Sequence, residues 1–115
     1  MTLKIYHNPR CRKSREALQY LEQNKNEFEV INYIENKLTK QELISLLDQL
    51  GYLPEELIRK NEAIWKADYK EKSWTFDQLI AALIEHPKLI ERPIISNGKQ
   101  AVIARPIEQL IEFLN

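Results

Sequence analysis

The first third of the chain alternates between strand-like and helix-like patterns of apolar residues. Residues 3–6 fit a short strand, which the turn-forming pair Asn8-Pro9 ends. Apolar residues then recur at helical spacing, which predicts a helix from about residue 11 or 12 to about residue 24. Alternation returns over residues 28–33. We therefore predict strand, helix and strand in this order.

Helix-start signals dominate the middle of the chain. Two capping-box patterns, Thr39 with Glu42 and Thr75 with Gln78, each precede apolar residues at helical spacing. The first of these helices should end at Gly51, and the second just before the proline that follows it. Both helices are predicted with defined beginnings and ends.

Two further segments of the middle region have weaker patterns. Pro54 is placed to begin a short helix that runs through residues 57 and 58. The segment 65–74 combines aromatic residues with lysines and interrupting acidic residues, which we interpret as a packed, solvated loop rather than a nucleic-acid surface. His86 stands at a predicted helix end, where we expect a capping cation rather than a catalyst.

The last third again predicts strands, followed by a helix. Residues 94–95 and 101–103 are strand-like, and Asn97-Gly98 between them is a signal for a two-residue hairpin. Pro106 is placed to begin a final helix. The order β-α-β, helices, then β-β-α predicts an α/β fold with a mixed β-sheet: the first two strands are parallel, and the hairpin adds an antiparallel edge.

Length and composition restrict the class of protein. The chain has 115 residues, of which 43% are hydrophobic and 30% charged, as in an ordinary globular protein. We expect a single domain over 1–115 with a helical insertion at about 38–88, and a monomer. The formal net charge of zero argues against a general nucleic-acid binder. No targeting segment or membrane-spanning apolar stretch is visible, so we expect a cytoplasmic protein without membrane contact.

Cys11 is the only cysteine, which excludes an intramolecular disulfide and a multi-thiolate zinc site. We expect no metal and no bound cofactor. A reducing compartment is the natural setting for such a chain.

The surroundings of Cys11 favour a reactive thiolate. It lies where a strand-ending loop meets a predicted helix N-terminus, and four cations occur within residues 10–15. The helix dipole, these cations and His7, four residues upstream, would all favour the ionised thiol. A lone cysteine is more often a small buried hydrophobe, but the cluster of cations argues against burial.

The window Cys11-Arg12-Lys13-Ser14 has a hydroxyl where a second thiol would stand in a Cys-x-x-Cys motif. Chemistry that passes through a disulfide must therefore recruit an external thiol, such as glutathione or a redox protein.

Three later arginines are candidates for binding an oxyanion: Arg59, Arg92 and Arg105. Two of them precede prolines at the ends of the predicted hairpin, where side chains commonly project into a site. The guanidinium group presents a planar fork of donors that suits phosphate, sulfate or arsenate. Any one arginine is more often a solvated surface group.

These residues resemble the glutaredoxin-coupled arsenate reductases, the ArsC family. The resemblance covers essentially the whole chain and rests on the segments Tyr6-His7-Asn8-Pro9-Arg10-Cys11-Arg12-Lys13-Ser14-Arg15, Arg59-Lys60-Asn61, Glu85-His86-Pro87, Arg92-Pro93-Ile94 and Arg105-Pro106. It implies a thioredoxin-like fold with a helical insertion, in which Pro93 is the cis-proline that faces the active cysteine.

The resemblance also implies a mechanism. The Cys11 thiolate attacks an arsenate ion, His7 helps to keep the thiol ionised, glutathione attacks the arsenic adduct, and glutaredoxin resolves the mixed disulfide as arsenite leaves. The implied substrate-binding residues are Arg59, Arg92, Arg105 and, with less weight, Arg15, and the implied structural residues of the site are Asn8, Ser14 and Pro93.

Two alternatives remain open at this point. One is a monothiol glutathione-dependent disulfide oxidoreductase, and the other is an Spx-like transcription regulator that binds RNA polymerase. The Spx proteins carry Cys-x-x-Cys, whereas this chain has Ser14 at the second position. They also lack the pair seen here at Arg105-Pro106, as do some of the small thiol reductases. Both departures favour the arsenate reductase.

Overall fold

The computed structural model describes residues 2–115, and its elements follow the predicted order. The chain divides into two compact units: the chain up to Asn36 together with Arg92–Asn115, here called the sheet unit, and Lys37–Glu91, the helical unit. The elements are β1 (Leu3–Tyr6), α1 (Arg12–Gln23), β2 (Phe28–Ile31), α2 (Lys40–Leu50), the 3-10 helix η1 (Pro54–Leu57), α3 (Ala63–Asp68), α4 (Phe76–Glu85), the 3-10 helix η2 (Pro87–Leu89), β3 (Ile94–Ser96), β4 (Ala101–Ile103) and α5 (Ile107–Leu114).

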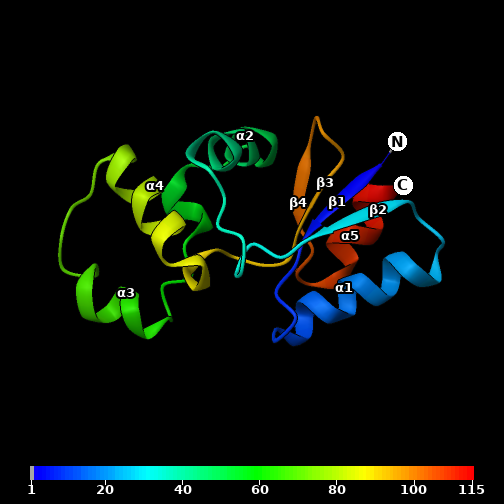
Figure 1. Ribbon diagram of the computed structural model, residues 1–115, viewed down its shortest axis with the longest axis horizontal. Coiled ribbons are helices and arrows are strands. Elements are labelled where there is room, and N and C mark those ends of the chain that lie inside the picture. Colours follow the sequence, from blue (N-terminus) through cyan, green and yellow to red (C-terminus); the bar gives the residue numbers. More distant parts are fainter. Residues whose placement is uncertain (1) are drawn as a thin grey trace. The chain divides into compact units, whose positions relative to one another are not determined.

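The sheet unit is built on four strands in the order β2-β1-β3-β4 (Figure 1). β1 is parallel to β2, with Leu3 opposite Phe28, and antiparallel to β3, with Ile5 opposite Ile95. β3 and β4 form the antiparallel hairpin at the edge. The predicted mixed sheet is confirmed, since the helix α1 between β1 and β2 is the crossover that a parallel pair requires.

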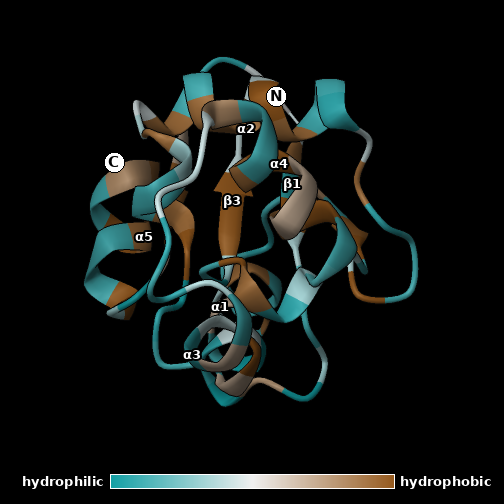
Figure 2. Cartoon of the chain, turned by 90° about the vertical axis from the view of Figure 1, so that its left-hand side faces the viewer, coloured by the Kyte–Doolittle hydropathy of each residue, from teal (hydrophilic) through white to brown (hydrophobic). Residues whose placement is uncertain are grey.

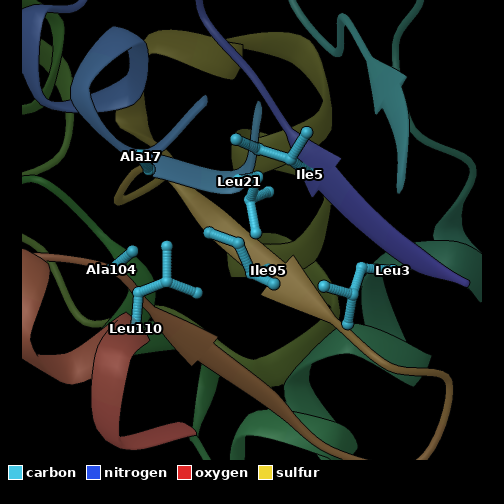
Figure 3. Packing of buried hydrophobic residues seen from close by; sticks show 7 residues of the cluster. All are labelled: Leu3, Ile5, Ala17, Leu21, Ile95, Ala104 and Leu110. Carbon is cyan, nitrogen blue, oxygen red and sulfur yellow. The ribbon is translucent and has the colours of Figure 1, made fainter. Parts of the chain in front are cut away.

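The core of this unit forms where α1 and α5 cover one face of the sheet (Figure 3). Alternate residues of a strand point to the same face, so Leu3 and Ile5 of β1 reach the core together. Ala17 and Leu21, one helical turn apart in α1, pack against them. β3 is coloured mainly as hydrophobic in Figure 2, and Ile94 and Ile95 are fully buried, as expected for a strand in the interior of a sheet. The members of the cluster are Leu3, Ile5, Ala17, Leu21, Ile95, Ala104 and Leu110.

In the helical unit the two predicted capping boxes are confirmed. Thr39 accepts a hydrogen bond from the Glu42 amide at the start of α2, and Thr75 accepts one from the Gln78 amide at the start of α4. α2 ends at Gly51, whose φ of 72° lies in the left-handed region. These local signals set the helix ends because each cap satisfies backbone groups that the helix leaves unpaired.

The aromatic segment was predicted as a loop, which is wrong for residues 65–68 but correct for residues 69–74. Residues 63–68 form the helix α3, and Trp65 stacks on Tyr69 with ring centroids 5.6 Å apart. The indole N–H of Trp74 donates to the Tyr69 carbonyl over 2.8 Å. Trp65 is buried in the structure. In the sequence, the polar residues around it obscure the helical spacing of apolar residues.

The predicted hairpin is confirmed, with its tip one residue later than predicted. β3 and β4 pair as far as Ser96 and Ala101, and the Asn97 amide donates to the Gln100 carbonyl over 3.0 Å, so the two residues at the tip are Gly98-Lys99. The Asn97 side-chain oxygen accepts from the amides of Lys99 and Gln100, which closes the turn. Gly98 adopts a φ of 93° within it.

Two X-Pro peptide bonds are cis. The bond between Arg92 and Pro93 is cis, as the family resemblance implies, and the bond between Arg105 and Pro106 is cis as well, which the sequence did not indicate. Pro106 is the N-cap residue of α5 rather than its first helical residue. Within residues 2–115, no helix combines the length and the apolar character needed to cross a membrane.

Candidate active site

Three chain segments meet at one end of the sheet and bring most of the predicted site residues together. Tyr6, the last residue of β1, pairs with Ile94, the first residue of β3. Ile94 also pairs with Ile103, the last residue of β4. The segment that begins with His7 therefore leaves the sheet at the end where Arg92-Pro93 enters it and where Ala104-Arg105 leaves it.

A hydrogen-bonded loop carries the chain from β1 to Cys11. The Asn8 side-chain oxygen accepts from the Arg10 amide over 3.0 Å, and the Asn8 carbonyl accepts from the Cys11 amide over 3.0 Å. The Arg15 guanidinium donates to the Pro9 carbonyl over 2.9 Å. Asn8 is thus a structural residue of the loop, and Arg15 supports the loop through its backbone.

Ser14 connects this loop to helix α1. Its side chain is fully buried, and its hydroxyl oxygen accepts from the Asn8 amide over 3.0 Å. The same oxygen lies 2.6 Å from Nδ1 of His7. Ser14 is therefore the link between His7, the loop and the first turn of α1.

Cys11 is the N-cap residue of α1, with extended backbone angles and a half-buried side chain. Burial is the largest influence and raises the pKa of the thiol. A hydrogen bond from Arg92, the amide of Ser14, the positive charge of Arg92 and the amide of Lys13 together outweigh it, so that the pKa of Cys11 lies below its ordinary value. Amides at a helix N-terminus and one guanidinium group therefore favour the nucleophilic thiolate form of Cys11.

His7 is buried, and its ring is held in the neutral form. Removal from water lowers the pKa of His7, and the positive charge of Arg15 lowers it further. A neutral imidazole has one ring nitrogen that carries a proton and one that accepts a hydrogen bond. Through Ser14, His7 is connected to the helix turn whose amide stabilises the thiolate. That His7 itself helps to keep Cys11 ionised stays a prediction.

The three candidate arginines are not equally placed. Arg92 acts directly on Cys11. Arg105 is exposed and follows β4, where the Ala104 amide donates to the Pro93 carbonyl over 2.9 Å, so its backbone lies beside the Arg92-Pro93 segment. Arg59 belongs to the helical unit, so its part in a site with Cys11 stays a prediction.

Arg59 has a partner that the sequence did not reveal. Its Nε lies 3.5 Å from a carboxylate oxygen of Glu91. Glu91 immediately precedes Arg92, but no motif singled it out, because the pairing depends on two segments about 30 residues apart coming together. Among residues 2–115, no group of three or more His, Cys, Asp or Glu side chains is arranged to hold a metal ion.

Comparison with known proteins decides the family. Residues 6–113, nearly the whole chain, match the ArsC family. The chain belongs to the ArsC family.

Known proteins are similar to this chain over nearly its whole length. The uncharacterised protein YfgD of Escherichia coli K12 is 42% identical over 114 residues, which span 97% of this chain and 96% of that protein. An arsenate reductase of Acidiphilium multivorum is 38% identical over 96% of this chain and 79% of its own length. The solved structure of an arsenate reductase from Vibrio cholerae superposes with a TM-score of 0.89 at 43% identity, covering 97% of each chain. The ArsC relatives and the mixed sheet together establish the thioredoxin-like fold.

Proposed function

We propose that this protein is an arsenate reductase that uses Cys11 as its nucleophile. The observation that carries the proposal is the position of Cys11, which caps α1 beside Arg92 with its pKa below the ordinary value. The arsenate reductases among its relatives are similar to this chain over 96% or more of its length and support the same assignment. A lower pKa increases the fraction of Cys11 present as thiolate, and a thiolate can attack an arsenic centre without first losing a proton.

The first half of the reaction forms a sulfur–arsenic bond. The Cys11 sulfur attacks the arsenic atom of arsenate, and one oxygen of arsenate takes up protons and leaves as water. Arsenic remains in the +5 state in this adduct. Positive charge around the oxyanion would counteract the repulsion between two anions, which is the role we assign to Arg59, Arg92 and Arg105.

The second half transfers two electrons to arsenic. Glutathione thiolate attacks the Cys11 sulfur, the sulfur–arsenic bond breaks with its electron pair remaining on arsenic, and arsenite leaves. Cys11 is then joined to glutathione in a mixed disulfide. A second glutathione, with glutaredoxin as catalyst, attacks this disulfide, releases oxidised glutathione and returns the Cys11 thiolate.

Both thiols that complete the reaction must come from glutathione, because the chain has no second cysteine. Cys11 is the only cysteine in the sequence, and Ser14 occupies the place of a nearby second thiol. The buried Ser14 hydroxyl contacts His7 and the Asn8 amide, so it serves the structure of the loop. We therefore assign no redox step to residue 14.

A coupled assay tests the proposal. The protein is mixed with arsenate, glutathione, glutaredoxin, glutathione reductase and NADPH, and loss of NADPH absorbance is followed. We expect consumption that requires both arsenate and glutaredoxin and that disappears in Cys11→Ser. Arg10→Ala, which alters an exposed cation next to Cys11, serves as the matched control and should retain most of the activity.

The same assay separates the proposed function from its main alternative. Arsenate is replaced by a small mixed disulfide of glutathione. Rapid turnover of the disulfide, with arsenate inert in parallel with an active ArsC reductase, would contradict the proposal and identify a glutathione-dependent disulfide oxidoreductase.

A further inference from the structure

A short antiparallel pairing in the helical unit sets the position of Arg59. Ile58 and Ile90 form a β-bridge, and both are buried. The Arg59 amide donates to the Leu89 carbonyl over 2.7 Å. The Glu91 amide donates to the Leu57 carbonyl over 2.8 Å. The backbones of Arg59 and Glu91 are therefore fixed on two adjacent strand-like segments.

The pairing places the side chains of Arg59 and Glu91 on one face. Each residue is one position beyond the Ile58–Ile90 pair, and side chains alternate between the two faces of such a pair. Arg59 and Glu91 are diagonal neighbours, which long side chains can span. The Nε atom of Arg59 and Oε1 of Glu91 are 3.5 Å apart.

The guanidinium group of Arg59 is only partly used by this contact. Glu91 lies at Nε, whereas Nη1 is buried and has no hydrogen-bond partner within residues 2–115. A buried donor on a charged group that lacks an acceptor is costly, and such a group marks a place where an added acceptor is stabilising. Nη1 is therefore a donor of Arg59 for which an oxyanion would supply the missing acceptor.

We propose that Glu91 is a positioning residue that fixes the Arg59 guanidinium at Nε and so keeps Nη1 available to an oxyanion ligand. The inference rests on the proposed function in one respect, because it takes arsenate as the oxyanion that Arg59 binds. An unpaired arginine side chain loses rotational freedom when it binds a ligand, which costs conformational entropy. The contact with Glu91 already restricts the Arg59 side chain, so less entropy is lost when the oxyanion binds.

A second effect of Glu91 opposes the first. Its carboxylate is negative, so it also repels an oxyanion near the same guanidinium group. The two effects separate in variants, because glutamine offers a side-chain oxygen to Nε but carries no charge. Alanine removes both the acceptor and the charge.

The experiment measures arsenate binding and turnover in the full-length protein. Isothermal titration with sodium arsenate, without glutathione, is carried out on the wild type, Glu91→Ala and Glu91→Gln. We expect Glu91→Ala to weaken arsenate binding about fivefold, which is at the upper end for loss of one partly exposed ion pair. Glu91→Gln should bind at least as tightly as the wild type. In the coupled assay, Glu91→Ala should raise KM for arsenate more than it lowers kcat.

Two controls distinguish positioning from a general structural effect. Glu55→Ala removes the exposed pair with Lys60 at 2.9 Å in the same unit and should leave arsenate binding unchanged. In an Arg59→Ala background, the further change Glu91→Ala should cause no further weakening of arsenate binding, because the positioning effect requires Arg59.

Each remaining outcome has a defined meaning. Unchanged binding in Glu91→Ala, tighter binding in both Glu91 variants, or no arsenate binding by the wild type would overturn the role of Glu91. If Glu91→Ala binds arsenate more weakly than the wild type, Glu91→Gln binds it at least as tightly, and the wild type does not reduce arsenate, the role of Glu91 is supported and the proposed reductase is refuted.

Discussion

At the scale of single residues, the reactivity of Cys11 depends on different groups from those that the sequence emphasises. The cations beside it in the chain suggested an electropositive loop. The structure gives the main favourable roles to backbone amides of α1 and to Arg92, which lies 81 positions later. Position at a helix N-terminus could be predicted from the local pattern, whereas the contact with Arg92 required the pairing of β1 with β3.

Arg92→Ala tests this electrostatic account. The rate of Cys11 alkylation by iodoacetamide is measured as a function of pH, and its midpoint gives the pKa of the thiol. Loss of the hydrogen bond and the positive charge should move the midpoint to higher pH, so that less thiolate is present at pH 7.

Arg10→Ala is the matched control for this titration, because its side chain is exposed and adjacent in sequence. We expect its midpoint to stay close to that of the wild type. Equal shifts in both variants would mean that net charge in the loop, rather than the contact with Arg92, determines the pKa.

At the scale of elements, local chemistry predicted helix ends better than it predicted irregular segments. Thr39 and Gly51 stand where caps are needed, and α2 begins and ends at these residues. The helix α3 was missed because it is only six residues long and has no side-chain cap, and because the sequence pattern does not reveal the stacking of Trp65 on Tyr69. The hairpin was predicted, but its centre lies one residue later than Asn97-Gly98, because the Asn97 side chain accepts from the Gln100 amide while the Asn97 amide donates to the Gln100 carbonyl.

Variants at the two ends of α2 test how much its caps contribute to stability. Thr39→Ala should lower the free energy of unfolding by about 1 kcal/mol, since the Glu42 amide loses its acceptor. Gly51→Ala should cost about 1 kcal/mol, because alanine is disfavoured at a φ of 72° although no neighbouring atom lies within 4 Å of the added carbon. Urea unfolding measures both.

Thr2→Ala serves as the control for the cap variants, because Thr2 is exposed and outside any helix. Its effect should stay within about 0.5 kcal/mol. If Thr39→Ala were equally mild, the capping box would contribute nothing measurable to α2.

At the scale of the whole molecule, the order of elements predicted the sheet but not the assembly of the site. A strand, helix and strand at the N-terminus and a C-terminal hairpin are enough to expect a mixed sheet, and the ArsC relatives agree. The convergence of His7, Arg92 and Arg105 at one end of that sheet depends on strand register, which the sequence does not display. The pairing of Arg59 with Glu91 depends on a bridge between distant segments in the same way.

The central claim is that arsenate is reduced through Cys11, and a single-turnover experiment without glutaredoxin tests it most directly. Protein is incubated with arsenate and glutathione, then arsenite is quantified and the intact protein is weighed by mass spectrometry. We predict about one arsenite per protein, together with one glutathione joined to Cys11 only when arsenate is present. Arsenite formation by Cys11→Ser, or a glutathione adduct that forms equally without arsenate, would contradict the claim.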